Sequence, residues 1–150
     1  MRYATALRHH VERSLRRDLG LGPLTANENG AYVCCVEGRN VVVAPEDDCA
    51  TVRVWAPAAF ELKRTAALLR ELNDVNCHQR HVRVVWEDGL VVAVSERAVK
   101  SVEVGELGWL VRLVAECASR VSELVAAVYG GTISAAWSNQ PDGPGRRQGS

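Results

Sequence analysis

The feature of this sequence that most constrains its fold is an apolar stripe near the C-terminal end. Between Leu107 and Val128, apolar residues recur at alternating steps of three and four. That spacing is typical of a helix that buries one side. Gly130 and Gly131 follow at once, and glycine is the residue that most often closes a helix. The sequence therefore predicts one long helix with a single buried side over this range.

Two further helices are predicted earlier in the chain. The first covers residues 2–19 and is closed by a glycine. Its apolar residues recur at every fourth position, at Tyr3, Leu7, Val11 and Leu15. The second begins at Thr65, whose hydroxyl suits an N-cap, and runs to about Val75.

Three short runs rich in β-branched residues lie between these two helices, at residues 32–36, 41–44 and 51–56. Short polar segments separate the runs, which is typical of an antiparallel meander. Pro57 is expected to end the third strand, because proline has no N–H to donate to a neighbouring strand.

A β-hairpin is predicted next, in the stretch RHVRVVWEDGLVVAVSE. We expect residues 87–89 to form a three-residue loop with a left-handed glycine at its end. This register puts six side chains on one buried face: Val82, Val84, Trp86, Leu90, Val92 and Val94. It puts Val85, Val91 and Ala93 on the opposite face.

The predicted order is helix, three strands, helix, two strands and a long helix. Such an order predicts an α+β fold in which helices pack on one face of a five-stranded antiparallel sheet. We expect one domain over residues 1–131, since 150 residues suffice for one core. Residues 132–150 form a tail that is expected to be disordered from about residue 138, although Ile133 and Trp137 could still pack.

The composition argues against several classes of partner. Eighteen basic and 18 acidic side chains give a formal net charge of zero, so no nucleic-acid partner is expected. The start of the chain lacks the apolar run of a signal peptide, and no segment is apolar over the length that a membrane helix needs. We therefore expect a cytoplasmic protein with no membrane partner.

No arrangement of residues typical of an enzyme or a metal site stands out. The five cysteines include no CxxC pair, and most are expected to be buried, reduced thiols. Cys34 and Cys35 would point to opposite faces of a strand, and so would His78 and His81 of an extended segment. We predict no catalytic residue, no metal and no cofactor.

Three stretches together resemble a known group of bacterial proteins. TAALLRELNDVN is followed by HVRVVWEDGLVVAV, and the last helix ends in VYGG. These stretches are similar to the YbjN and type III secretion chaperone-like families, and the resemblance covers residues 1–131. The residues that carry it are Leu72, Asn73, Asn76, Trp86, Asp88 and Gly89.

The resemblance implies a small peptide-binding chaperone with this fold. Type III secretion chaperones are commonly homodimers that hold an extended client along their surface, so a second copy of this chain is one candidate partner. The sequence has no secretion-system marker, and the client class is therefore not carried over. Asn73 and Asn76 are expected to end the second helix and fix the reversal into the hairpin, because asparagine amides readily bond to nearby backbone. A polar ligand site built from these two amides is the alternative.

The two faces of the predicted sheet indicate where a partner would bind. If helices cover one face, the other should be polar, yet we expect apolar or weakly polar residues there. These residues are Val33, Cys35, Val42, Trp55, Val85, Val91 and Ala93. The partner of such a surface could be a second copy, a client segment or the chain's own tail through Trp137. Alternatively, both faces are covered within one chain, and an unpaired edge strand offers a peptide another route.

The sequence thus predicts a non-catalytic chaperone or adaptor that binds a protein or peptide client. The residues predicted to contact the client are Trp55, Val85, Trp86, Val91 and Trp109, although Trp86 faces the core in the register above.

Two other functions remain open. A regulatory protein could bind an anionic partner through a basic side of the first helix, formed by Arg8, Arg13, Arg16 and Arg17. A thiol-based enzyme or redox sensor could instead use Cys77 or the adjacent Cys34 and Cys35.

Overall fold

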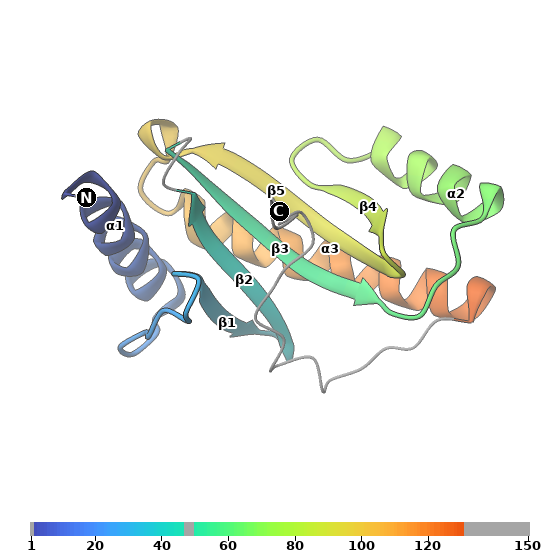
Figure 1. Cartoon of the computed structure of the whole chain (residues 1–150), viewed down its shortest axis with the longest axis horizontal. Coiled ribbons are helices and arrows are strands. Elements are labelled where there is room, and N and C mark those ends of the chain that lie inside the picture. The colour runs from blue at the N-terminus through green and yellow to red at the C-terminus, as the bar shows by residue number, and fades with distance from the viewer. Residues whose placement is uncertain (1, 47–49, 131–150) are drawn as a thin grey trace, which may run out of the picture.

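The computed structural model describes residues 2–46 and 50–130. The elements follow one another in the order α1 (Arg2–Leu19), β1 (Tyr32–Val36), β2 (Arg39–Glu46), β3 (Thr51–Ala59), α2 (Ala66–Cys77), β4 (Arg83–Glu87), β5 (Leu90–Ala98), η1 (Val99–Ser101) and α3 (Glu106–Tyr129). Apart from the short 3₁₀ helix η1, this is the order predicted from the sequence (Figure 1). The α+β fold class is thereby confirmed.

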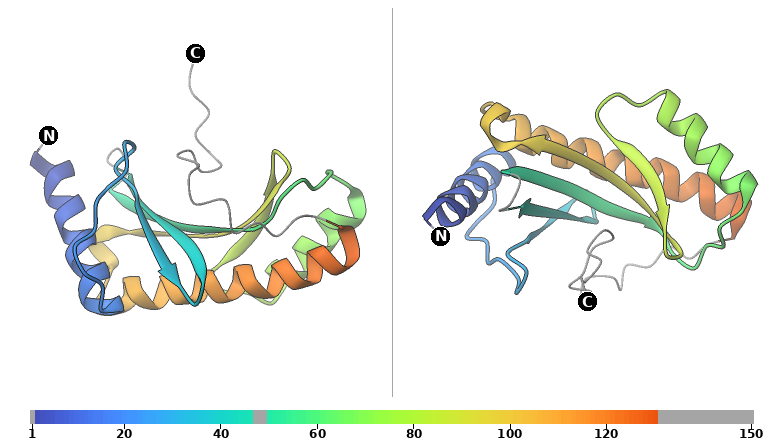
Figure 2. Two further views of the ribbon diagram at one scale, coloured as in Figure 1. Left: turned by 90° about the horizontal axis from the view of Figure 1, so that it is seen from below. Right: turned by 45° about the horizontal axis from the view of Figure 1, so that its top comes forward.

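The five strands form one antiparallel sheet in the order β1-β2-β3-β5-β4. Figure 2 shows α3 running along one face of this sheet, with α1 beside the start of α3 and α2 beyond the β4 edge. The molecule therefore has one sheet layer and one helix layer.

The main core lies between these two layers. It contains the inward-facing residues of the strands, such as Val43 and Val54, which have no exposed surface. On α3 the predicted stripe is buried from Leu107 to Val125, whereas Val128 is 62% exposed. The stripe was thus predicted correctly except in its last turn.

Left-handed glycines and an N-capping threonine mark the ends of the helices. Gly20 and Gly130 follow α1 and α3 with left-handed φ angles of 64° and 74°. The hydroxyl of Thr65 accepts a hydrogen bond of 3.1 Å from the N–H of Leu68 at the start of α2. These are the helix ends that the sequence predicted.

A carboxylate from α1 caps the start of α3. Asp18 Oδ2 accepts the N–H of Gly108 at 3.1 Å, and Arg112 donates to the carbonyl of Asp18 at 3.0 Å. A negative charge at a helix N-terminus also interacts favourably with the helix dipole. The approach is close because glycine has no side chain, and a Cβ built on Gly108 would overlap that of Asp18. This contact fixes α1 against α3.

The predicted register of the hairpin was wrong. Its turn has only two central residues, Asp88 at φ 50° and Gly89 at φ 86°, so Glu87 pairs with Leu90 and Trp86 with Val91. Two left-handed residues form the type I′ turn, whose twist matches that of the flanking strands. Burial could not decide between the registers, because both faces of β5 are apolar.

The prediction that Pro57 ends the third strand was also wrong. β3 continues to Ala59, and its pairing with β5 shifts by one residue between Pro57 and Ala59. A bulge of this kind accommodates a residue that cannot donate to the ladder. The carbonyl of Pro57 still accepts a hydrogen bond of 3.0 Å from Arg39.

The side chain of Asn76 bonds to the outer side of β4. Its Nδ2 donates to the carbonyl of Val84 at 2.9 Å, and its Oδ1 accepts the N–H of Val84 at 2.7 Å. The amide thus takes the place of a neighbouring strand at this point and ties the end of α2 to the hairpin. The Nδ2 of Asn73 instead donates to Cys77 Sγ at 3.9 Å, so the two amides bond to different groups.

Some sequence predictions fall outside the described residues. The proposed domain boundary at 131, the tail from residue 132, Ile133, Trp137 and Cys49 all lie there. Among the helices that the structure does describe, none combines the length and the hydropathy needed to cross a membrane.

Candidate functional site

The face of the sheet that points away from α3, here called the far face, carries a continuous row of apolar side chains. Val33, Val42, Trp55 and Val94 are directly paired neighbours across β1, β2, β3 and β5. On β4 the position next to Val94 is the charged Arg83, so the apolar row ends there. Figure 1 views the molecule from this side, with α3 behind the sheet. Trp55 therefore lies at the middle of the far face.

A second apolar cluster surrounds Trp55 and is separate from the main core. We call it the far-face cluster; its members are the buried Ala31, Val42, Trp55, Val92 and Val94 and the partly buried Ala44 and Val85. Trp55 is 5% exposed, Val94 2% and Val92 only 1%. The centre of the far face is thus as inaccessible to water as the main core.

Within the described part of the chain, the helices lie on the other side of the sheet. α1 and α3 pack into the main core, and α2 adds Leu68 and Leu72 to that same core. The left view of Figure 2 shows α3 on one side of the strands and no described helix on the other. The far-face cluster therefore has no described helix above it.

Charged side chains border the far face at one end. Glu96 Oε1 lies 3.7 Å from Arg53 Nε and 3.4 Å from Arg83 Nη2. Because Glu96 and Arg83 are largely exposed, each pair contributes at most about 1 kcal/mol to stability. Their main effect is to give the apolar area a polar boundary.

The β1 edge lies at the other side of this surface and carries no charged side chain. Val33 is 41% exposed and Cys35 is also exposed, and both point to the far face. In the described sheet β1 pairs only with β2, so the outer N–H and C=O groups of β1 have no strand partner. An extended peptide can pair with such an edge. The far face and a free sheet edge thus meet at Val33.

Two of the predicted contact residues, Trp55 and Val85, lie together in the far-face cluster. Val91 does not, because the observed register turns it toward the helices, where it has no exposed surface. Its placement on the outer face was therefore wrong. Val92 and Val94 occupy the far face instead, and the sequence reasoning missed them. The signal that could have identified them is Asp-Gly, which favours a two-residue turn.

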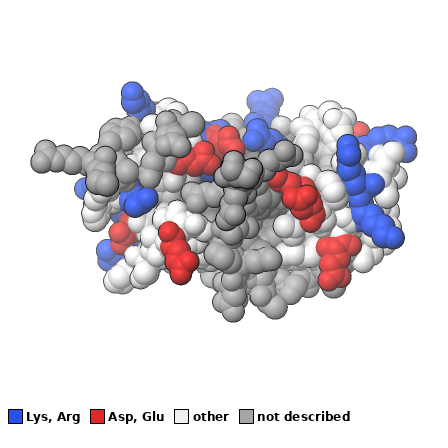
Figure 3. All heavy atoms as spheres, in the orientation of Figure 1, with Lys and Arg blue, Asp and Glu red and all other residues white. Residues whose placement is uncertain are grey.

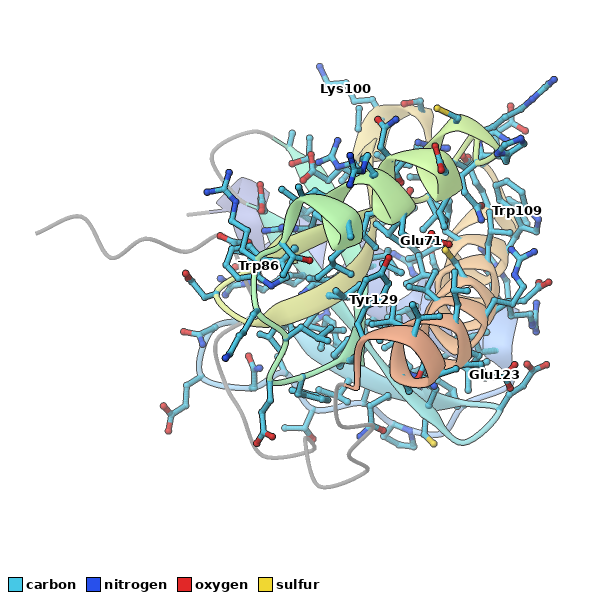
Figure 4. The ribbon with its side chains drawn as sticks, turned by 90° about the vertical axis from the view of Figure 1, so that its right-hand side faces the viewer. Glu71, Trp86, Lys100, Trp109, Glu123 and Tyr129 are labelled. Atoms are coloured by element: carbon cyan, nitrogen blue, oxygen red, sulfur yellow. The ribbon has the colours of Figure 1, made fainter. Side chains whose placement is uncertain are left out.

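The other two predicted residues lie elsewhere. Trp86 packs against the main core and donates from Nε1 to the carbonyl of Leu62 at 2.9 Å, which is a structural role. Trp109 is 44% exposed on α3, with its ring edge-on to that of His81 at 5.0 Å. In Figure 4, Trp86 and Trp109 lie near opposite ends of α2. The five predicted residues therefore do not form one site.

The adjacent cysteines are separated by the sheet. Cys34 points into the main core and Cys35 to the far face. Burial raises the pKa of the Cys34 thiol to about 11 and also raises the pKa of Cys117. Both thiols are therefore protonated at neutral pH, whereas the thiolate is the reactive form.

Cys77 is exposed at the end of α2 beside His78. The ring of His78 is turned to the helix, with Nδ1 2.8 Å from the carbonyl of Asp74. No group of three or more His, Cys, Asp or Glu residues in the described part of the chain could hold a metal ion. The geometry thus does not assemble a base next to this thiol.

A basic groove lies along α1, on another part of the surface. It has a volume of about 750 Å³ and is lined by His9, Glu12, Arg13, Arg16, Arg17 and Leu21. Arg8 is not part of it, because its guanidinium lies against Gly30. Arg17 also forms an ion pair of 3.0 Å with Asp18. In Figure 3, positive and negative side chains are interspersed over the visible surface rather than gathered in one patch.

Solved structures share this fold at low sequence identity. A chain of the Yersinia pestis type III secretion chaperone SycH in complex with a stable fragment of YscM2 is 15% identical, with a TM-score of 0.62; the match covers 77% of this chain and 99% of that one. A chain of the Pseudomonas aeruginosa type III secretion complex ExoU-SpcU is 19% identical, with a TM-score of 0.58, over 75% and 95% of the two chains. E. coli YbjN is 20% identical, with a TM-score of 0.57, over 80% and 91%.

A comparison with curated protein sequences found no match. A family model does match, over residues 5–136, and describes "T3SS (YopN, CesT) and YbjN peptide-binding chaperone 1". The match includes every strand of the sheet and almost all of α1. The chain therefore belongs to the family of type III secretion and YbjN peptide-binding chaperones.

Proposed function

We propose that this protein is a non-catalytic chaperone or adaptor that binds an extended segment of a client protein. The binding surface is the far face together with the β1 edge. The observation that carries the proposal is the row from Val33 to Val94, which joins an apolar centre to a strand edge. The thiol-based alternative has less support, because the buried thiols are protonated and His78, the residue next to Cys77, turns its Nδ1 to the carbonyl of Asp74.

The chemistry of this surface suits an extended peptide. Hydrogen bonds to the outer side of β1 would hold the client backbone, and alternate client side chains would contact the exposed Val33 and Cys35 at this border of the far face. Each apolar client side chain that becomes fully buried would contribute roughly 1.5–3 kcal/mol before the cost of ordering the peptide. A few such contacts are enough for a specific complex.

The related proteins support this function. The Yersinia pestis chaperone was solved with a fragment of YscM2, and another structure of the same fold is a chaperone–effector complex. For the present chain we propose a class of client, an extended protein segment, and no particular protein. The cytoplasmic location expected from the sequence stays a prediction.

The test is affinity capture from the native host followed by mass spectrometry, with three full-length variants. Val33→Arg places a charge at an exposed position of the far face and should abolish capture of the client without loss of stability. Trp55→Ser should do the same but also lowers stability, because Trp55 is buried. Trp109→Ser removes an exposed tryptophan from α3 and is the matched control that should capture the same proteins as wild type. If Val33→Arg and Trp55→Ser retain the whole set of captured proteins, the far face is not the binding surface.

The basic groove supports a second candidate function, binding of an anionic partner. Three arginines and a histidine line it against one glutamate. Such binding should weaken steeply as salt is added and should be lost in Arg13→Gln/Arg16→Gln. Binding to the groove that does not depend on salt would exclude this function.

A further inference from the structure

We propose that a client adds to the sheet as a further strand beside β1, with apolar residues opposite Val33 and Cys35 and a basic residue opposite Val36. The selection rests on the proposed function, because it states which client sequence the β1 edge prefers. Two features of the molecule carry it. They are the outward backbone groups of β1 and the exposed carboxylates near the end of that strand.

The turn between β1 and β2 decides which backbone groups of β1 point outward. Glu37 and Gly38 have left-handed φ angles of 51° and 77°, and Val36 pairs with Arg39 on either side of them. The pair that closes a two-residue turn exchanges both of its hydrogen bonds, and such bonded pairs recur at every second residue of an antiparallel ladder. The residues of β1 that bond to β2 are therefore Tyr32, Cys34 and Val36.

The N–H and C=O groups of Val33 and Cys35 point away from β2 instead. No strand of the described sheet lies on that side of β1. The side chains of the same two residues are exposed and point to the far face. One added strand would therefore bond to the backbone of both residues and cover both side chains. Client residues directly opposite them would share the far face, where apolar pairs stabilise a sheet.

The client residue opposite Val36 would point to the other side of the sheet, where α3 lies. That side is polar near the end of β1. Arg39, which pairs with Val36, donates from Nε to Ser119 Oγ and from Nη1 to the carbonyl of Pro57, both at 3.0 Å. The guanidinium of Arg39 is therefore already bound to α3 and β3.

Glu123 follows Ser119 by one turn of α3 and is exposed. Burial lowers the pKa of the Arg39 guanidinium, and the nearby charge of Glu123 raises it in part, so the two side chains lie close together. No ion pair joins Glu123 to any described side chain. Figure 4 shows Glu123 on the side of α3 away from α2. Glu37 adds a second exposed carboxylate in the turn after β1.

A lysine or arginine of the client opposite Val36 would therefore have a carboxylate of Glu123 or Glu37 available to it. An ion pair between exposed groups is weak, and we expect a preference of roughly two- to fivefold over a neutral residue. The backbone bonds and the apolar contacts supply the affinity, whereas the charge selects among clients.

Synthetic peptides test the selection with the full-length protein. The probe is the acetylated and amidated peptide Thr-Lys-Val-Thr-Val-Lys-Thr, which has the same sequence in both directions. A lysine therefore lies opposite Val36 whichever way the strand runs. Glutamine or glutamate replaces both lysines in the matched probes. In titrations followed by NMR, the lysine peptide should bind the most tightly and the glutamate peptide the least, with roughly two- to fivefold between successive probes.

Amide hydrogen exchange, measured residue by residue, shows where the lysine peptide binds. The N–H groups of Val33 and Cys35 should exchange roughly tenfold more slowly in the complex. Those of Cys34 and Val36 should change little, because they already bond to β2. Unchanged exchange at Val33 and Cys35, or the absence of binding by all three peptides, would overturn strand addition and with it the place of the β1 edge in the proposed function.

The variant Glu123→Gln tests the selecting residue. It should weaken binding of the lysine peptide roughly two- to fivefold and leave the glutamine peptide unaffected. Glu71→Gln removes a carboxylate from α2 and is the matched control that should bind all three peptides as wild type does. At about 1 M salt, where the screening length falls to roughly 3 Å, the preference should disappear. Equal affinities of the three peptides, with exchange still slowed at Val33 and Cys35, would overturn the selection and leave the proposed function in place.

Discussion

At the contact between α1 and α3, Gly108 leaves room for the side chain of Asp18. Gly108→Ala should lower the free energy of unfolding by about 1–3 kcal/mol, because the new methyl group overlaps Asp18 and pushes the capping carboxylate away. Urea unfolding of the two proteins measures this difference. Gly22→Ala is the matched control, since an added Cβ at Gly22 meets no atom within 4 Å. Equal losses at the two glycines would show that the contact does not constrain the helices.

A second residue-scale prediction concerns the amide of Asn76. Asn76→Asp keeps the size of the side chain but replaces the Nδ2 donor with an oxygen that faces the carbonyl of Val84. We expect a loss of about 1 kcal/mol in unfolding free energy, since Asn76 is partly buried and an unpaired polar group costs less there than in a closed core. Asn73→Asp, one turn earlier on the same helix, should cost much less, since Asn73 is exposed and its amide donates to a sulfur at 3.9 Å. A larger loss for Asn73→Asp would contradict the role given to Asn76.

The buried Cys34 thiol predicts a pH dependence of stability. Burial raises its pKa in the folded state to about 11, above the ordinary value of 9.0, so the folded protein keeps the proton over a range in which the unfolded chain releases it. Stability should therefore be unaffected by this group below pH 9 and should fall as pH rises from 9 to 11. Cys34→Ala should fall less steeply over that range in urea unfolding at matched pH values. Parallel curves for the two proteins would rule out this contribution.

At the scale of elements, the three helices and five strands could be predicted because each has its own periodicity. Thr65, Gly20 and Gly130 also marked the helix ends correctly. The pairing register of β4 and β5 could not be predicted from the same hydrophobic patterns. β5 reads Leu-Val-Val-Ala-Val, so a shift by one residue exchanges one apolar face for another and burial gives no preference. The turn decides the register instead, and it does so through backbone twist.

At the scale of elements, the two-residue turn between β4 and β5 leads to a testable prediction. Gly89→Ala should cost about 1–2 kcal/mol, because φ 86° lies in the left-handed region that other residues adopt only with strain. Asp88→Asn should cost almost nothing, since Asn-Gly also suits a type I′ turn. Thermal unfolding of both variants is the measurement. A larger loss for Asp88→Asn than for Gly89→Ala would contradict the two-residue turn.

For the whole molecule, the sequence predicted that an apolar sheet face would lie opposite the helices, with Trp55 and Val85 on it. It left open whether this face is exposed or covered within one chain, because periodicity within one strand carries no information on what packs against the face. Trp109 failed as a contact residue for a related reason. The sequence shows that Trp109 lies on a helix, but not on which side of the sheet that helix packs. Here α3 packs on the side opposite the far face, so the exposed Trp109 is not part of that surface.

The bond between Asn76 and β4 also limits how copies of this protein could assemble. A sheet that grows without end by edge-to-edge addition needs two vacant edges on every molecule. In the described chain the side of β4 is occupied by an amide and a helix, so only β1 can accept another strand. Two copies joined through β1 would use up that edge on both, and growth would stop at a pair instead of continuing into a fibre.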